Sequence, residues 1–192
     1  SNKGSNRSNS KVHNIDKIDE EYYTHIYRRQ NVGLAINQFC VGIALYFSVT
    51  PLWFYMVDTL DATPAQQSLV TGLTFLPWGL KIFFGFIVDS LDLTSLGLGR
   101  RKPILVLGWL VFILSNIGLA ALVEPDICSL AALFLLSNMG YVQADVCCDA
   151  MIVERSKKYE TPANRGQLQA TGYTLRFGGG VIGAILGACL YN

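Results

Sequence analysis

Apolar residues in this sequence gather into five long stretches that are separated by short polar connections. A helix needs about 20 apolar residues to cross the roughly 30 Å hydrocarbon core of a bilayer, and each stretch is long enough. Buried strands would span only about 4–8 residues, and a spanning segment must satisfy its backbone polar groups internally. The pattern therefore predicts five transmembrane helices, over residues 32–57, 68–88, 103–123, 127–153 and 167–191.

The first 30 residues differ from everything that follows. The opening SNKGSNRSNSKVHN is rich in Ser and Asn and lacks the apolar content that builds a core. We interpret residues 1–30 as a disordered cytoplasmic tail and residues 31–192 as the membrane domain. The tail has no apolar stretch of the kind that a signal peptide carries. A short surface helix over residues 15–29 is the alternative to a solvated tail.

Composition supports a membrane protein and excludes several other classes. Hydrophobic residues make up 51% of the chain and charged residues 15%, whereas soluble domains carry about 25% charged residues. The net charge of +1 predicts no nucleic-acid partner. The five cysteines lack metal-binding spacing, and both histidines lie in the tail. No catalytic triad or phosphate-binding loop is visible, so we predict no enzyme, no cofactor and no metal site.

Basic residues concentrate on alternate connections between the predicted spans. Thirteen of the fifteen lie in the tail, in the loop between the second and third spans, or in the loop between the fourth and fifth. The other two loops carry only acidic charge. Because Lys and Arg accumulate on cytoplasmic loops, we predict a cytoplasmic N-terminus. The pattern does not distinguish the plasma membrane from an organelle membrane.

Four ionisable residues lie inside the predicted spans. Each charge costs about 2.5–3.5 kcal/mol at the centre of a spanning helix, so such residues normally face a protein interior or a water-filled cavity. Asp145 and Asp149 are four residues apart and share one helical face, while Lys81 lies in the second span and Arg176 in the fifth. We therefore predict that two cations and two carboxylates converge on one cavity from three helices.

Neutral residues extend this predicted cavity. They are Asn138, Trp78 and, in the first span, Gln38. The alternative is that each cation pairs with one carboxylate, in either combination, and that these buried salt bridges only fix the packing of the helices. Lys81 also lies near enough to the cytoplasmic end for its ammonium to reach the interface.

Other motifs are interpreted as architectural. Gly179, Gly183 and Gly187 form a GxxxGxxxG pattern, which lets two helix backbones approach closely. Pro77 is expected to kink the second span. The segment Thr63-Pro64-Ala65-Gln66 reads as a capping box that begins the helix of this span.

Two segments, residues 55–103 and 144–156, resemble a known family of carriers. Gly85-x-x-x-Asp89, with Gly-Arg-Arg-Lys at the end of the loop, resembles the second-to-third loop of the major facilitator superfamily. Within that superfamily, LPWGLK and Asp-Val-x-x-Asp-Ala resemble the folate–biopterin transporter family. The sequence departs from the family pattern at Ile82, where members usually have Pro, and in a longer loop before the basic cluster.

The resemblance implies an all-α integral membrane protein whose five spans are a partial N-terminal half of a twelve-helix fold of two six-helix halves. It implies secondary active carriage of folate, pterin or a related small organic anion by alternating access, and leaves proton coupling open. The expected partners are such a substrate and the lipid bilayer.

The resemblance also suggests roles for individual residues. Lys81 and Arg176 would bind anionic groups of the substrate, and Asp145 or Asp149 would bind ring donors or carry a proton. Asn138, Gln38 and Trp78 would complete the substrate site. The residues expected to latch the cytoplasmic side in one state of the cycle are Asp89, Arg100, Arg101, Glu154 and Arg155.

Two other functions fit the same pattern of spans. One is a different carrier of the superfamily, such as a proton-coupled sugar transporter, although a neutral sugar gives little reason for both Lys81 and Arg176. The other is a truncated membrane protein without transport activity, such as a receptor or a scaffold.

Overall fold

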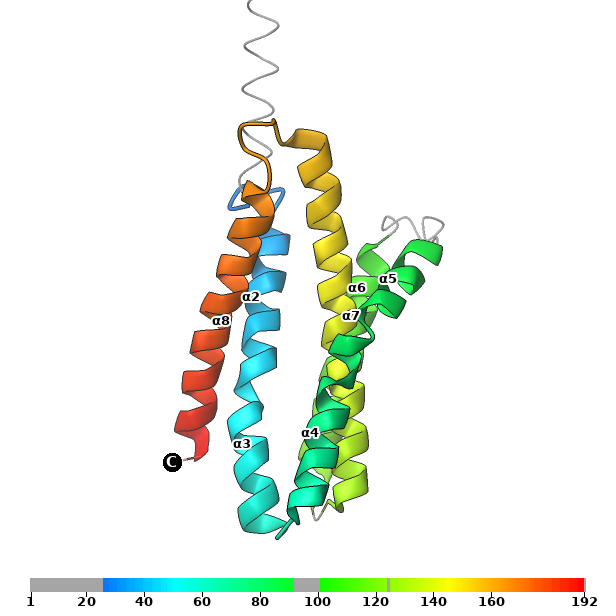
Figure 1. Cartoon of the computed structure of the whole chain (residues 1–192), viewed down its shortest axis with the longest axis vertical. Helices are drawn as coiled ribbons and strands as arrows, with labels where there is room; N and C mark the ends of the chain where they lie inside the picture. Colours follow the sequence, from blue (N-terminus) through cyan, green and yellow to red (C-terminus); the bar gives the residue numbers. More distant parts are fainter. Residues whose placement is uncertain (1–25, 92–100, 124, 192) are drawn as a thin grey trace, which may run out of the picture.

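The computed structural model describes residues 26–91, 101–123 and 125–191, and these ranges contain helices and turns but no strand. Most of the predicted tail, and Arg100 of the predicted latch, lie outside the described residues. The helices are α2 (Val32–Phe47), α3 (Val49–Phe54), the π-helical η1 (Tyr55–Thr59), α4 (Pro64–Gly79), α5 (Lys81–Ser90), α6 (Lys102–Ala121), α7 (Ile127–Tyr159) and α8 (Gln167–Tyr191) (Figure 1).

The predicted spans correspond to these helices. Residues Val32–Thr59, α6, α7 and α8 are each long and apolar enough to cross a membrane, and α4 with α5 adds a fifth span if the bent pair is counted as one. The protein is therefore an all-α, multi-pass membrane protein. The fourth span is longer than predicted, because α7 continues through the charged residues after Val153 to Tyr159. Glu, Arg and Lys are good helix formers, so the helix does not end where the apolar stretch ends.

The second span begins and bends as the sequence predicts. The Thr63 hydroxyl accepts a hydrogen bond from the Gln66 backbone, and the Gln66 side chain accepts one from the Thr63 backbone at 2.8 Å. Pro77 interrupts the hydrogen bonding near the end of α4, and the chain bends by 42° between α4 and α5. The bend lies at Leu80, so that Lys81 begins a new helix.

The helices form two groups that meet along α7. In Figure 1, α8 runs beside α2 and α3, while α4 and α6 lie against α7, in agreement with the most extensive contacts. The glycine pattern of α8 allows its close approach to α2, since a Cβ added at Gly183 would lie 2.7 Å from the Ile43 carbonyl oxygen. A Cβ added at Gly108 of α6 would lie equally close to the Gly140 carbonyl oxygen of α7.

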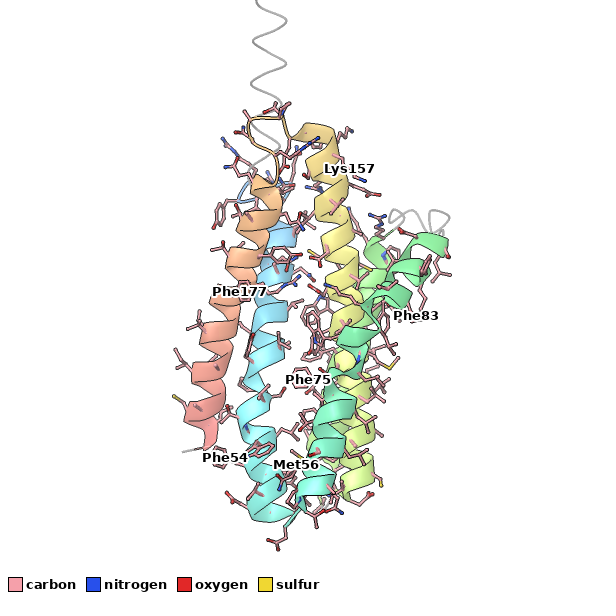
Figure 2. All side chains as sticks on the ribbon, in the orientation of Figure 1. Phe54, Met56, Phe75, Phe83, Lys157 and Phe177 are labelled. Atoms are coloured by element: carbon pink, nitrogen blue, oxygen red, sulfur yellow. The ribbon has the colours of Figure 1, made fainter. Side chains whose placement is uncertain are left out.

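Large apolar side chains cover the outer surface of the bundle. Figure 2 shows Phe83 on α5 and Phe177 on α8 pointing away from the neighbouring helices, and the two residues are 65% and 63% exposed. In water such a surface would mark a binding site or an aggregation hazard. In a bilayer it faces acyl chains, which leaves the inner faces of the helices for polar residues.

Candidate functional site

The four ionisable residues of the spans form one cluster. The Lys81 ammonium on α5 lies 2.7 Å from Asp145 Oδ2 and 2.8 Å from Asp149 Oδ2, both on α7. From α8, Arg176 Nη2 contacts Asp145 Oδ1 and lies 3.0 Å from Asp149 Oδ1. Each cation therefore contacts both carboxylates. Both of the pairings that the sequence left open, Lys81 with either carboxylate and Arg176 with the other, are present at once.

Gln38 joins the cluster from α2, which is the fourth helix to contribute a residue. Its side-chain oxygen accepts a hydrogen bond from Arg176 Nε at 2.7 Å, and its nitrogen donates to Asp149 Oδ1 at 2.9 Å. The amide thus contacts a cation and an anion at once. Gln38 is 1% exposed, so its two bonds are made away from lipid and water.

Exposure divides the cluster into two parts. The side chain of Asp145 is fully buried and that of Arg176 is 9% exposed, whereas those of Lys81 and Asp149 are 30% and 24% exposed. Lys81 also lies over the Trp78 ring, with Nζ 5.3 Å from its centre, a favourable position for a cation. A molecule that reaches the cluster therefore meets Lys81 and Asp149 first.

Two further hydrogen bonds begin at Trp78 of α4, whose ring lies beneath the Lys81 ammonium. Trp78 Nε1 donates to the Tyr141 hydroxyl at 3.1 Å, and that hydroxyl donates to Asn138 Oδ1 at 2.6 Å. Sequence reasoning missed Tyr141. The signal was present, because Tyr141 lies three residues after Asn138 and four before Asp145, and therefore on the face that these residues share.

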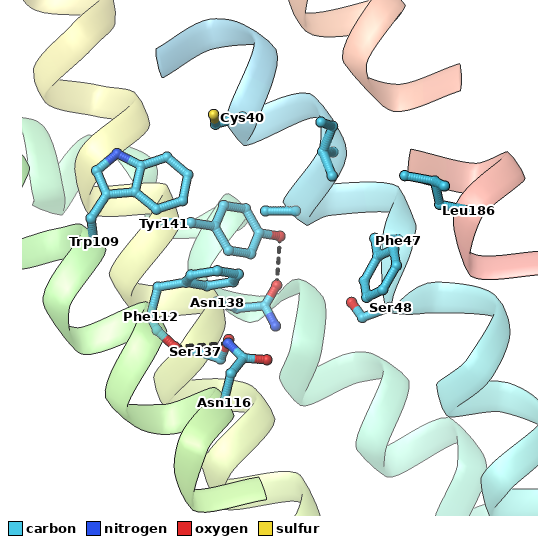
Figure 3. Close-up of a pocket in the computed structure, with 12 residues that line it drawn as sticks. Cys40, Phe47, Ser48, Trp109, Phe112, Asn116, Ser137, Asn138, Tyr141 and Leu186 are labelled. Carbon is cyan, nitrogen blue, oxygen red and sulfur yellow. Dashed lines mark hydrogen bonds between the residues drawn. The ribbon is translucent and has the colours of Figure 1, made fainter. Parts of the chain in front are cut away.

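A cavity of ≈ 420 Å³ lies beside these hydrogen bonds, between the two groups of helices. Figure 3 shows the Tyr141–Asn138 hydrogen bond, together with Asn116 of α6 donating to Ser137 of α7, and both bonds lie among residues that line the cavity. The lining is mostly apolar with these few polar groups, a composition typical of small-molecule sites. The lining residues are Cys40, Ile43, Ala44, Phe47, Ser48, Trp109, Phe112, Asn116, Ser137, Asn138, Tyr141 and Leu186.

Aromatic rings form one wall of the cavity. The Trp109 and Phe112 rings meet edge to face with centres 5.5 Å apart, and Phe112 meets Tyr141 similarly at 5.9 Å. Trp109 Nε1 donates to Asn37 of α2 at 2.7 Å, which fixes its orientation. Trp109 and Phe112 were not among the predicted site residues, because nothing in their spacing distinguishes a cavity wall from packing.

Part of the predicted latch is assembled near the end of α5. Arg101 lies 2.9 Å from Asp89 Oδ1 and 3.0 Å from Glu154 Oε1, so one guanidinium joins α5, the start of α6 and the end of α7. Arg155 contacts a different segment. It donates to the Gln30 carbonyl at 2.7 Å and contacts the Asn31 side chain, so these contacts are with the segment before α2.

Glu160 organises the connection between α7 and α8. Its carboxylate contacts the Ser156 hydroxyl and accepts from the backbone of Gly166 at 2.6 Å and Leu168 at 2.8 Å. Burial raises the pKa of Glu160, but these hydrogen bonds outweigh it and hold its pKa below the ordinary value. Gly166 has φ +86°, a conformation that glycine adopts without strain.

Apolar helices enclosing a buried charge cluster define a polytopic α-helical membrane protein, and within the described ranges no group of three His, Cys, Asp or Glu is placed to hold a metal ion. A family model described as the BT1 family matches residues 41–192. The chain belongs to the BT1 family.

Curated relatives of the chain are named as members of the family that the sequence motifs resemble. The chain is 30% identical over 148 residues to an Arabidopsis thaliana protein named probable folate-biopterin transporter 4, covering 73% of this chain and 28% of that one. It is 32% identical over 143 residues to the Synechocystis folate-biopterin transporter, covering 70% and 26%. The resemblance to this family is thus confirmed. The chain spans about a quarter of the length of these relatives, and no solved structure matches it significantly.

Proposed function

We propose that this chain forms the first five spans of a secondary transporter that carries folate, pterin or a related small organic anion by alternating access. In this proposal the N-terminus is cytoplasmic and residues 31–192 belong to the N-terminal half of a twelve-helix carrier. The names of the relatives support the substrate class. The observation that carries the proposal is the charge cluster, which is connected to the cavity through the Trp78 ring and the hydrogen bond from Trp78 to Tyr141.

The cluster is suited to exchange one anion for another. Lys81 is held by two carboxylates, of which Asp149 is the more exposed. A substrate carboxylate that replaces Asp149 at Lys81 would exchange one ion pair for another. Asp149 would keep its contacts with Arg176 and Gln38, so neither Lys81 nor Asp149 would be left unpaired in a low-dielectric site. The buried pair of Arg176 and Asp145 would hold α7 and α8 together during the exchange.

The arrangement of helices suggests how access could alternate. The cavity lies between the group formed by α2, α3 and α8 and the group formed by α6 and α7, and the Arg101 contacts with Asp89 and Glu154 close one end of α5 onto α7. Relative motion of two groups of helices is a common basis of alternating access. We infer that the Arg101 contacts form in one state and break in the other.

The test is uptake by the full-length protein in proteoliposomes. Lys81→Met should abolish uptake of labelled folate, while Lys157→Met, at an exposed position of the same charge, should leave it unchanged at equal protein levels. Unchanged uptake in Lys81→Met would remove Lys81 from the site.

Competition by pterin but not by glucose is expected, and inhibition by glucose alone would favour a sugar carrier. Loss of uptake on collapse of a pH gradient would identify proton coupling.

A further inference from the structure

A second pocket lies at the end of α7, away from the charge cluster. Its volume is ≈ 260 Å³, and its lining residues are Gln30, Glu154, Arg155, Lys158 and Tyr159. These residues follow the predicted fourth span, which ends at residue 153, or precede the first. The pocket therefore lies where the helices leave the apolar layer, at the end of the bundle that carries the basic connections.

The charges that line this pocket are unequally compensated. Glu154 is 3.0 Å from Arg101, so its charge is already matched. Arg155 contacts the neutral groups of Gln30 and Asn31. Lys158 lies over the Tyr159 ring, with Nζ 5.1 Å from its centre. Within the described part of the chain neither Arg155 nor Lys158 has a carboxylate partner, which leaves two positive charges in one pocket.

The guanidinium of Arg155 is held in place for binding. Its contacts with Gln30 and Asn31 are both made through Nη1, which leaves its Nη2 and Nε donors for a further ligand. Arginine carries five N–H donors in a rigid fork that matches phosphate oxygens. The Lys158 ammonium adds a second positive charge, four residues after Glu154 and on the same face of α7.

We propose that this pocket binds a phosphate group, and that its source is the headgroup of an anionic lipid at the edge of the bilayer. Basic pockets beside spanning helices on the cytoplasmic side favour such headgroups, and each nearby cation strengthens their binding. Arg155 donates to the phosphate oxygens, Lys158 neutralises the charge, and the aromatic ring of Tyr159 lies at the depth of the headgroups, where such rings are enriched. The bound lipid would connect α7 to residues 26–31 before the first span.

The experiment is a titration of the detergent-solubilised full-length protein, followed by its thermal unfolding midpoint. The probes are phosphatidylglycerol, phosphatidylcholine and, in solution, glycerol 3-phosphate. Phosphatidylglycerol should raise the midpoint and phosphatidylcholine should not. Lys158→Gln should weaken the response about fivefold, the effect of removing one cation beside an anionic headgroup. Lys157→Gln, one residue away and outside the pocket, should respond like the unaltered protein.

The outcomes distinguish the proposal from general charge attraction and from loss of folding. Equal weakening in Lys157→Gln and Lys158→Gln, or no response to either of the two anionic probes, phosphatidylglycerol and glycerol 3-phosphate, would overturn it. A response to both anionic probes that Lys158→Gln weakens would support the site and identify a soluble phosphate ester as an additional ligand. Arg155→Gln also loses the contacts with residues 30 and 31, so Lys158→Gln is the decisive variant. Because neither residue belongs to the charge cluster, folate uptake and lipid binding can fail independently.

Discussion

The ammonium of Lys81 bridges Asp145 and Asp149, two carboxylates one turn apart on α7, at 2.7 and 2.8 Å. Arg176 contacts the same two carboxylates from the other side. The four charges cancel, and all of them lie on inner faces of the helices. Ionisable residues that pair with one another in this way can be retained inside a membrane.

Removing one member of the buried pair should destabilise the protein more than removing both. Arg176→Gln leaves the fully buried Asp145 with one cation fewer, and breaking a buried pair costs about 3–5 kcal/mol. Arg176→Gln combined with Asp145→Asn keeps the cluster neutral and should recover part of that loss. The check is a double-mutant cycle of unfolding free energies. Strictly additive effects would show that the two residues do not act as a pair.

Tyr141→Phe should impair the cavity without disrupting the fold. The substitution removes a hydroxyl that accepts from Trp78 and donates to Asn138, and leaving such a buried group unpaired costs about 1–3 kcal/mol. We expect a higher KM for uptake and a lower unfolding temperature. A matched change is Tyr27→Phe, at a residue that is 67% exposed, which should alter neither value. Equal KM values for Tyr141→Phe and the unaltered protein would exclude the hydroxyl from the site.

Gly183→Ala should separate α8 from α2. The added Cβ would lie 2.7 Å from the Ile43 carbonyl oxygen, and overpacking of this kind costs about 1–3 kcal/mol. Gly178→Ala is the control, because no atom lies within 4 Å of its added Cβ and Ala is the better helix former. Thermal unfolding in detergent should show a lower midpoint for the first variant and an equal or higher one for the second. The reverse order would contradict the helix pairing.

Glu160 should make the connection to α8 sensitive to acid. Its pKa is lowered in the folded protein from an ordinary value of 4.5, so its stabilising effect is fully present above that value and is lost as the pH falls through the lowered pKa. Glu160→Gln should remove this dependence and reduce stability near neutral pH. Hydrogen exchange at the start of α8, measured from pH 6 down to about pH 3, would follow the loss. Identical pH profiles for both proteins would refute the capping role.

The sequence predicted those features that depend on one helix at a time. Apolar length located the spans, and four-residue spacing placed Asp145 and Asp149 on one face. Spacing within a helix does not say which helices become neighbours, and so it did not assign Gln38 its bridge between Arg176 and Asp149. For the same reason the sequence places Arg155 in the predicted latch beside Glu154, but it does not predict that Arg155 contacts Gln30 and Asn31 before α2.

The most direct test of the central claim is whether the cluster faces water inside the bilayer. In lipid nanodiscs, with the native cysteines replaced, Asp149→Cys and Phe83→Cys would each be treated with a charged methanethiosulfonate reagent and the modification followed by mass. The account predicts rapid modification of Asp149→Cys, slowed by folate, and none of Phe83→Cys, which faces lipid. Modification of Phe83→Cys with an unreactive Asp149→Cys would contradict it.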